Sequence, residues 1–367
     1  MTARVHNFNA GPAAMPLPVL EQAQRDLVDY QGAGMSVLEM SHRGGVYERI
    51  HQEAIDDLAA LLGTGDSHQI LFMGGGARAQ FAFVPMNLLP AGRFAEYVVT
   101  GSWAEIAWAE AKRLGDAREN WTSAGSGHDH VPSGGIVRAT EGSAYLHVTS
   151  NNTIYGTQFV TEPTLERGAT SGVPLVVDMS SDILSRPIDT ARYSLIYAGA
   201  QKNLGPAGVT VIVIRKDLLE NCRADLPEIF QYKKIAAQNS LLNTPPCFAI
   251  YMVGLVAKHV REMGGVEAAA RRNEEKAALI YDAINSSGGF YQGHAQPESR
   301  SRMNVTFRLP NEELEKAFLK EAAAASMEGL KGHRSVGGLR ASIYNAVPLE
   351  SVRALVGLMA EFRARRA

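Results

Sequence analysis

Cysteine is scarce in this chain, and so is any excess of charge. Cys222 and Cys247 are the only cysteines among 367 residues, and neither lies in a CxxC or zinc-like spacing. This excludes a disulfide framework and is typical of a reducing cytoplasm. The net charge is only −2 at pH 7, so nothing in the overall charge favours binding to nucleic acid or to an anionic membrane. We expect a cytoplasmic protein that holds no metal and acts on small molecules.

Long apolar runs are absent as well. The longest, residues 247–257, is too short to span a bilayer, and residues 1–12 lack the basic-then-apolar pattern of a signal peptide. We therefore expect no membrane partner. The hydrophobic content of 46% nevertheless suffices for a large core, and the length favours two domains over one.

Strand-length apolar runs alternate with helical patterns through the first two thirds of the chain. Helical spacing covers residues 46–62 and 103–114, and each pattern ends at a glycine. This alternation predicts an α/β domain with a mostly parallel sheet. The apolar runs are residues 69–73, 97–100, 144–149, 175–178, 194–200 and 209–214.

The composition changes after about residue 255. Helices rich in Ala, Glu, Lys and Arg are predicted over residues 265–286 and 311–327, a strand over 304–309, and a last helix from Leu349. We expect a large α/β domain over residues 16–255, and a smaller α+β domain made of residues 256–367 with the N-terminal segment 1–15.

Lys202 lies between an apolar strand-like stretch and a Gly/Pro turn. A partly desolvated lysine forms Schiff bases with carbonyl compounds, and its small neighbours leave room for a planar cofactor such as pyridoxal phosphate. An ordinary loop lysine would be solvated instead. Asp178 ends the strand before it, at the edge where ligands of α/β sheets collect, and there a carboxylate can hold a pyridine nitrogen protonated. A helix N-cap is the alternative role for Asp178.

Three further loops follow strands at the same predicted edge. Gly74, Gly75 and Gly76 open a helix whose backbone N–H groups can hold a phosphate, although a plain tight turn would have the same sequence. Trp103 can stack on a pyridine ring or belong to the core. Thr153 can bond the cofactor's phenolic oxygen or simply sit in a turn.

Basic residues stand among glycines at two places. They are the pairs His42-Arg43 and His333-Arg334, with Arg340 shortly after the second pair. Exposed basic pairs are commonplace and usually bind nothing. A guanidinium is nevertheless the side chain best suited to a two-pronged grip on carboxylate or phosphate, so these residues are candidate anion ligands.

Several blocks, taken in order along the whole chain, resemble the phosphoserine aminotransferases, which are fold-type-I, class V enzymes. The blocks are Asn7 to Pro12, Ser41-His42-Arg43, Gly74-Gly75-Gly76, Tyr197 to Asn203, Asn243-Thr244-Pro245-Pro246, Gly332-His333-Arg334 and Arg340 to Ala346. The resemblance implies a pyridoxal 5′-phosphate enzyme that moves an amino group from glutamate to 3-phosphohydroxypyruvate, with a seven-stranded-type sheet in its large domain. It further implies a homodimer with shared active sites.

Site roles follow from the resemblance by position. It implies Lys202 as the Schiff-base lysine and Asp178 on the pyridine nitrogen. Trp103 would stack on the ring and Thr153 would contact its phenolic oxygen. The phosphate ligands would be Ala77, Arg78 and Gln201, with Asn243 and Thr244 from the dimer partner. Arg340 would bind the substrate α-carboxylate, and the distal anion would be surrounded by His42, Arg43, His333 and Arg334.

The pattern departs from the family in residues 115–141, which match poorly, and at Asn152, where relatives often carry Glu. Another class V enzyme, such as an alanine–glyoxylate aminotransferase, is the nearest alternative. A cysteine desulfurase would need a mobile loop cysteine, and neither cysteine has a Gly/Ser-rich loop around it. A non-catalytic cofactor-binding protein is the remaining class.

Overall fold

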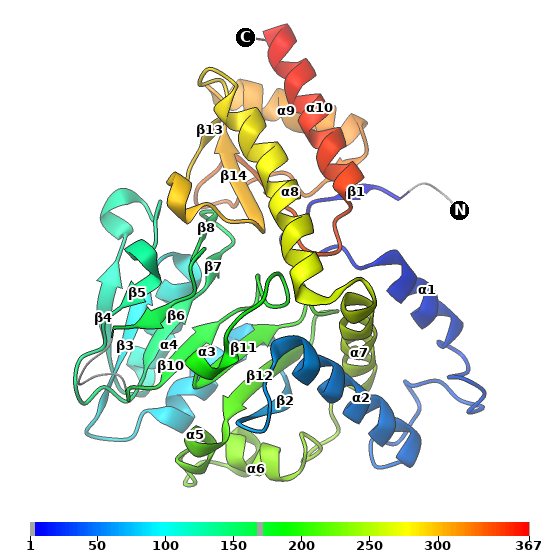
Figure 1. The fold of residues 1–367 in the computed structure, drawn as a ribbon, viewed down its shortest axis with the longest axis vertical. Helices are drawn as coiled ribbons and strands as arrows, with labels where there is room; N and C mark the ends of the chain where they lie inside the picture. Colours follow the sequence, from blue (N-terminus) through cyan, green and yellow to red (C-terminus); the bar gives the residue numbers. More distant parts are fainter. Residues whose placement is uncertain (1–3, 167–171, 367) are drawn as a thin grey trace.

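A seven-stranded sheet forms the centre of the computed structural model, which describes residues 4–166 and 172–366 (Figure 1). Its strands are β2 (His68–Gly74), β3 (Phe94–Val99), β4 (Asp116–Thr122), β6 (Leu146–Thr149), β10 (Leu175–Asp178), β11 (Leu195–Gly199) and β12 (Val209–Arg215). The strand order is β2-β12-β11-β10-β6-β3-β4. Only β12 runs against the other six, because it is antiparallel to both of its neighbours. The mostly parallel sheet predicted from the sequence is confirmed, and the carboxyl ends of six strands meet at one edge.

Both faces of this sheet are covered by helices, which is why its inner strands are almost wholly apolar. One face packs on α2 (Gly45–Leu62) and α7 (Cys247–Glu262). The opposite face packs on α3 (Gly76–Leu88) and α4 (Ser102–Leu114). The strands β10 and β11 are buried along their whole length. The helices predicted over residues 46–62 and 103–114 agree with α2 and α4 to within one residue.

A second core gathers the C-terminal part of the chain at the top of Figure 1. The helices are α8 (Gly265–Asn285), α9 (Glu312–Ala324) and α10 (Leu349–Arg366), and they surround an antiparallel sheet of β13 (Gln292–Gly293), β14 (Asn304–Arg308) and β16 (Leu339–Ser342). Phe8 and Ala14 belong to the same core. The N-terminal strand β1 (His6–Asn7) pairs with β15 (Met327–Glu328), so the N-terminal segment joins the C-terminal part of the fold.

Three differences from the sequence prediction concern the end of one helix and the presence of two strands. The helix expected over residues 311–327 ends at Ala324, because the chain turns at Ser326 with φ of 56° and enters β15. The strands β4 and β16 were not predicted. Both carry charged or polar residues at the positions that face out of the core, so neither gives an apolar run.

The remaining elements are short or peripheral. The helix α1 (Leu17–Arg25) packs with α2 and α7 in a fourth apolar cluster. The others are α5 (Lys216–Glu220), α6 (Tyr232–Ala237), β5 (Ile136–Val137), β7 (Asn151–Asn152), β8 (Thr157–Gln158) and β9 (Thr164–Leu165). Across residues 4–166 and 172–366, we find no helix that combines the length and the apolar character needed to cross a bilayer.

Candidate active site

A cavity of about 420 Å³ opens at the carboxyl edge of the seven-stranded sheet. Loops that follow β2, β3, β6, β10 and β11 form most of its wall, and β16 reaches it from the C-terminal part. This is the place where open α/β sheets bind ligands. Nine of the residues predicted for the site line it, namely Ala77, Arg78, Trp103, Thr153, Asp178, Gln201, Lys202, His333 and Arg340.

Lys202 stands in the turn between β11 and β12, as its sequence setting predicted. Backbone bonds close this turn: the Ala200 N–H donates to Val209 O at 3.0 Å, and the Gly205 N–H donates to Ala200 O at 2.8 Å. The N-terminal segment lies over the turn, since the Ala13 N–H donates to Gln201 O at 2.9 Å. The backbone that carries the lysine is therefore fixed on both sides.

The Lys202 amine is desolvated inside the cavity. Burial lowers the pKa of Lys202 to about 8, the nearby Asp178 carboxylate opposes this shift, and the charge of Arg340 adds to it. An amine with such a pKa is largely neutral in mildly alkaline solution, and the neutral form is the nucleophile and the base. The lysine is thus suited to covalent chemistry with a carbonyl group.

Asp178 ends β10 with its carboxyl group buried. The Ser180 N–H donates to Asp178 Oδ1 at 2.9 Å. Burial raises the pKa of Asp178, while the bonds from Ser180 and the charge of Lys202 act in the opposite direction and compensate only in part. A buried carboxylate of this kind is stabilised by a cationic N–H placed against it, which is what a protonated pyridine nitrogen provides.

The first turn of α3 offers backbone donors to an anion. Gly75 adopts φ of 93°, which lets the chain turn from β2 into the helix, and no side chain caps the helix start. The close packing needs Gly199 as well, because a Cβ there would lie 3.2 Å from the Ala77 nitrogen. Ala77 and Arg78 line the cavity from this turn. The arrangement is a typical phosphate site.

Trp103 and Thr153 are joined by a hydrogen bond. The Trp103 indole N–H donates to Thr153 Oγ1 at 3.0 Å, so the threonine hydroxyl proton remains available for another acceptor. The centre of a Trp103 ring lies 5.8 Å from Lys202 Nζ. The indole therefore faces the amine across the space that a planar ring would occupy.

Cationic groups line the other side of the cavity. Arg340 on β16 donates from Nη1 to Thr153 O at 2.9 Å, and its buried Nε has no partner among the described residues. Burial lowers the pKa of His333, and the charges of Arg340 and Arg334 lower it further. A buried guanidinium with a free donor is unstable without an anion, so this side of the cavity is suited to a carboxylate.

Five predicted site residues do not line this cavity. Arg43, Asn243, Thr244 and Arg334 are exposed, and His42 is half-buried with an unpartnered Nε2 among the described residues. One chain therefore assembles the lysine, the carboxylate and the helix N-terminus, and leaves most of the distal anion group outside.

Asn203 and Asn345, which the sequence did not single out, connect parts of the site. Asn203, next to Lys202, donates from Nδ2 to Ser181 O at 3.3 Å and accepts the Asn345 N–H at 3.0 Å. Both residues lie inside blocks already quoted for the family resemblance, and that was the only available signal.

Asn152 is buried and donates to Thr100 Oγ1 at 3.0 Å and to Thr157 Oγ1 at 3.2 Å, so it fixes the loop of Thr153.

Comparison with known proteins bears on this geometry. The family model described as aminotransferase class-V matches residues 5–355. A phosphoserine aminotransferase of Lysinibacillus sphaericus (strain C3-41) is 54% identical over 363 residues, which is 99% of each chain. The chain belongs to the phosphoserine aminotransferase family. Class V aminotransferases work with pyridoxal 5′-phosphate, so this family member is a pyridoxal-phosphate-dependent enzyme.

Solved structures of the family agree over the full length. The phosphoserine aminotransferase of Bacillus circulans subsp. alkalophilus superposes with a TM-score of 0.96 at 54% identity, over 99% of both chains. A Trichomonas vaginalis phosphoserine aminotransferase with bound PLP gives a TM-score of 0.90 at 37% identity, over 97% of this chain and 100% of that one. The fold-type-I prediction is confirmed. The cavity's lysine, buried carboxyl group and helix N-terminus fit the family's cofactor.

Proposed function

We propose that this aminotransferase moves the amino group of L-glutamate to 3-phosphohydroxypyruvate, which gives O-phospho-L-serine and 2-oxoglutarate, a reversible step of serine biosynthesis in the cytoplasm. The observation that carries the proposal is the meeting of Lys202, Asp178 and the α3 N-terminus in one cavity. The identity of 54% to family members over the full length supports the substrate pair.

The residues divide into cofactor-holding and proton-moving groups. Pyridoxal phosphate, when bound, supplies an aldehyde that joins covalently to amines and a ring that accepts the electron pair left at Cα. The first turn of α3, Arg78 and Gln201 would hold its phosphate. Asp178 would keep the ring nitrogen protonated, and Trp103 would lie against the ring. Thr153, whose hydroxyl accepts the Trp103 N–H, would donate its own proton to the phenolic oxygen.

Lys202 moves the proton. Its amine, once free of the cofactor, would take the Cα proton of the bound amino acid and hold it for return. Arg340 binds the α-carboxylate and so orients the Cα–H bond. A pKa near 8 leaves the amine basic enough to accept this proton and neutral enough to be available.

A homodimer completes the site in this proposal. Arg43, Asn243 and Thr244 are exposed and lie outside their own chain's cavity. A two-fold axis would bring the same residues of each chain to the other chain's site. Asn243 and Thr244 would then add to the phosphate site, and His42 and Arg43 would join His333 and Arg334 around the distal anion, which is a carboxylate in glutamate and a phosphate in phosphoserine.

We also propose domain limits at residues 16–255 and 256–367, with residues 1–15 in the second unit. The separate apolar cluster that unites Phe8 and Ala14 with α8, α9 and α10 supports this division. Limited proteolysis should then cut first in exposed loops, while the two cores stay intact.

A direct assay tests the function. Purified protein loaded with pyridoxal phosphate is given glutamate with 3-phosphohydroxypyruvate, and in parallel alanine with glyoxylate. We expect kcat/KM for glutamate with 3-phosphohydroxypyruvate to exceed that for alanine with glyoxylate by a factor of ~10³ or more, because several cationic groups would bind the distal anion. Preference for alanine and glyoxylate would refute the proposal. An assay with 4-phosphohydroxythreonine shows whether the enzyme also serves pyridoxine biosynthesis.

A further inference from the structure

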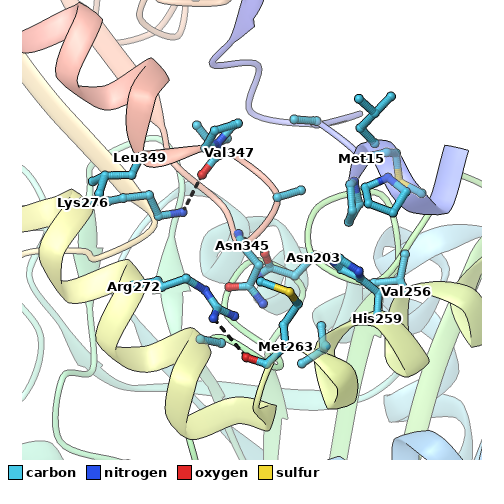
Figure 2. A pocket seen from close by; sticks show the side chains of 18 of the residues that line it. Met15, Asn203, Val256, His259, Met263, Arg272, Lys276, Asn345, Val347 and Leu349 are labelled. Carbon is cyan, nitrogen blue, oxygen red and sulfur yellow. Dashed lines mark hydrogen bonds between the residues drawn. The ribbon is translucent and has the colours of Figure 1, made fainter. Parts of the chain in front are cut away.

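A second cavity, of about 550 Å³, also borders the turn that carries Lys202, and Figure 2 shows it with Asn203 of that turn labelled. Its wall comes from residues 14–18, the end of α7, the first turns of α8 and the loop 345–349. Figure 2 shows His259 and Val256 facing Lys276 and Leu349 across this space. The volume is in the range of small-molecule sites, and the reaction proposed above leaves this cavity unused.

The wall of this cavity is mainly apolar. Val256 and Val260 on α7, Ala269 on α8 and the N-terminal Met15 contribute aliphatic surface. Such a surface stabilises an apolar group that leaves water, by about 25 cal/mol for each Å² that is buried. The body of any occupant is therefore expected to be hydrocarbon.

Cationic groups stand at one side of the same cavity. Arg272 donates one hydrogen bond, to Met263 O at 3.1 Å, and among the described residues no carboxylate lies within salt-bridge distance of it. The one acidic residue of the wall, Glu275, is paired with Arg353 at 3.5 Å. The guanidinium of Arg272 thus keeps donors for an external anion.

Burial and the charge of Arg272 lower the pKa values of two neighbouring groups, Lys276 and His259. Burial and the charge of Arg272 together lower the pKa of Lys276 to about 7. Burial also lowers the pKa of His259; there Glu262 opposes the shift and Arg272 adds to it. The Lys276 amine donates its three hydrogen bonds to the carbonyl oxygens of Ile343, Tyr344 and Val347, at 2.7–3.1 Å. An anion held by Arg272 would offset the mutual repulsion of these groups.

We propose that this cavity binds a small carboxylic acid with an apolar body. The carboxylate pairs with Arg272, and the hydrocarbon body fills the space between α7, α8 and residues 14–18. Lys202 and Asn203 also line this cavity, so the occupant lies against the turn that carries the active-site amine. The proposal rests on the cavity alone and does not require the substrate pair proposed above.

The test uses 3-phenylpropionate as probe and the pyridoxal-phosphate-loaded, full-length protein. Titration calorimetry should give a dissociation constant of ~1 mM or below, from the contact area of a small aromatic acid. The neutral amide of the same acid should bind at least ~10-fold more weakly, because it lacks the charge that pairs with a guanidinium.

Two adjacent arginines on α8 form a matched pair of variants. Arg272→Gln should weaken the acid at least ~10-fold, whereas Arg271→Gln, which changes an exposed arginine outside the cavity, should stay within about twofold of the parent protein. Arg340→Gln should retain the affinity. Loss in Arg340→Gln would place the probe in the cofactor cavity and overturn the proposal, and so would equal binding of acid and amide. Absence of binding below ~10 mM would overturn it as well.

Discussion

The lysine side and the distal-anion side of this active site are built in different ways. Lys202, Asp178 and Trp103 lie at the carboxyl ends of β11, β10 and β3 of one sheet and meet in the cavity of a single chain. Arg43 and Arg334 lie on exposed segments outside that cavity. Proton transfer needs fixed geometry, and a sheet edge supplies it. In our proposal, recognition of a distal anion belongs to surface loops, where substitution would change the substrate without disturbing the core.

The largest loss should follow removal of the amine. Lys202→Ala should lower kcat by ~10⁴-fold or more, while cofactor still binds through its phosphate. The measurement is steady-state transamination, together with borohydride reduction and peptide mapping. Lys316→Ala, which changes an exposed lysine, is the control. A reduced cofactor adduct on any lysine other than Lys202 would end this assignment.

The second-largest loss should come from Asp178→Asn. An amide of the same shape cannot keep the ring nitrogen protonated, so kcat should fall by ~10³-fold although the protein folds and binds cofactor. Absorbance of bound cofactor and far-ultraviolet circular dichroism check binding and folding. A rate within threefold of the parent would show that the carboxylate has no part in the chemistry.

Acidity should control how fast the cofactor-free protein captures pyridoxal phosphate. The pKa of Lys202 is lowered to about 8, so the neutral amine rises from ~1% of molecules at pH 6 to about half at pH 8. Below the pKa the protonated amine is unreactive, and the capture rate should therefore increase ~50-fold over this interval. Nα-acetyllysine, titrated in parallel, corrects for the cofactor's own ionisation. A rate that keeps rising to pH 10 would contradict the lowered pKa.

Arg334→Ala should separate the two sides of the site. We expect ~10-fold to 100-fold lower kcat/KM for phosphoserine and glutamate, and no change for alanine, which has no distal anion. Arg340→Ala should instead weaken all three amino acids, because each has an α-carboxylate. Equal losses for all three in Arg334→Ala would remove the distinction between the two arginines.

The smallest effect comes from mixed subunits. Lys202→Ala and Arg43→Ala proteins, each inactive alone, should recover about a quarter of parental activity when refolded together, because half the dimers are mixed and each mixed dimer has one intact site. Separately refolded samples, mixed afterwards without exchange, serve as the control. No recovery in the co-refolded sample would mean that Arg43 serves its own chain.

The sequence predicted the sheet and the lysine side well for a physical reason. Parallel strands are apolar on both faces, so β10 and β11 stand out as runs, and the residue after each run is already at the ligand-binding edge. The strands β4 and β16 escaped prediction. β4 lies at the sheet edge with exposed polar side chains, and β16 is short and contains the charged Arg340.

Local sequence patterns could not predict the contacts between segments that are distant along the chain. The hydrogen bond from the Asn345 backbone to Asn203 joins positions far apart in sequence, and either asparagine alone looks like a turn residue. The same holds for the Trp103–Thr153 bond. In our proposal, His42 and Arg43 reach a site only through association of chains, about which the spacing of residues says nothing.

The antiparallel strand β12 has a consequence for motion. It is paired along its length with β11 on one side and with β2 on the other, so the loop carrying Lys202 is anchored at both ends in the centre of the sheet. Amides of residues 195–199 and 209–215 should exchange with solvent only through global unfolding. The amine should then move during turnover by rotation about its own side-chain bonds. Slow conformational exchange of the backbone should be seen at Arg43 and Arg334 instead.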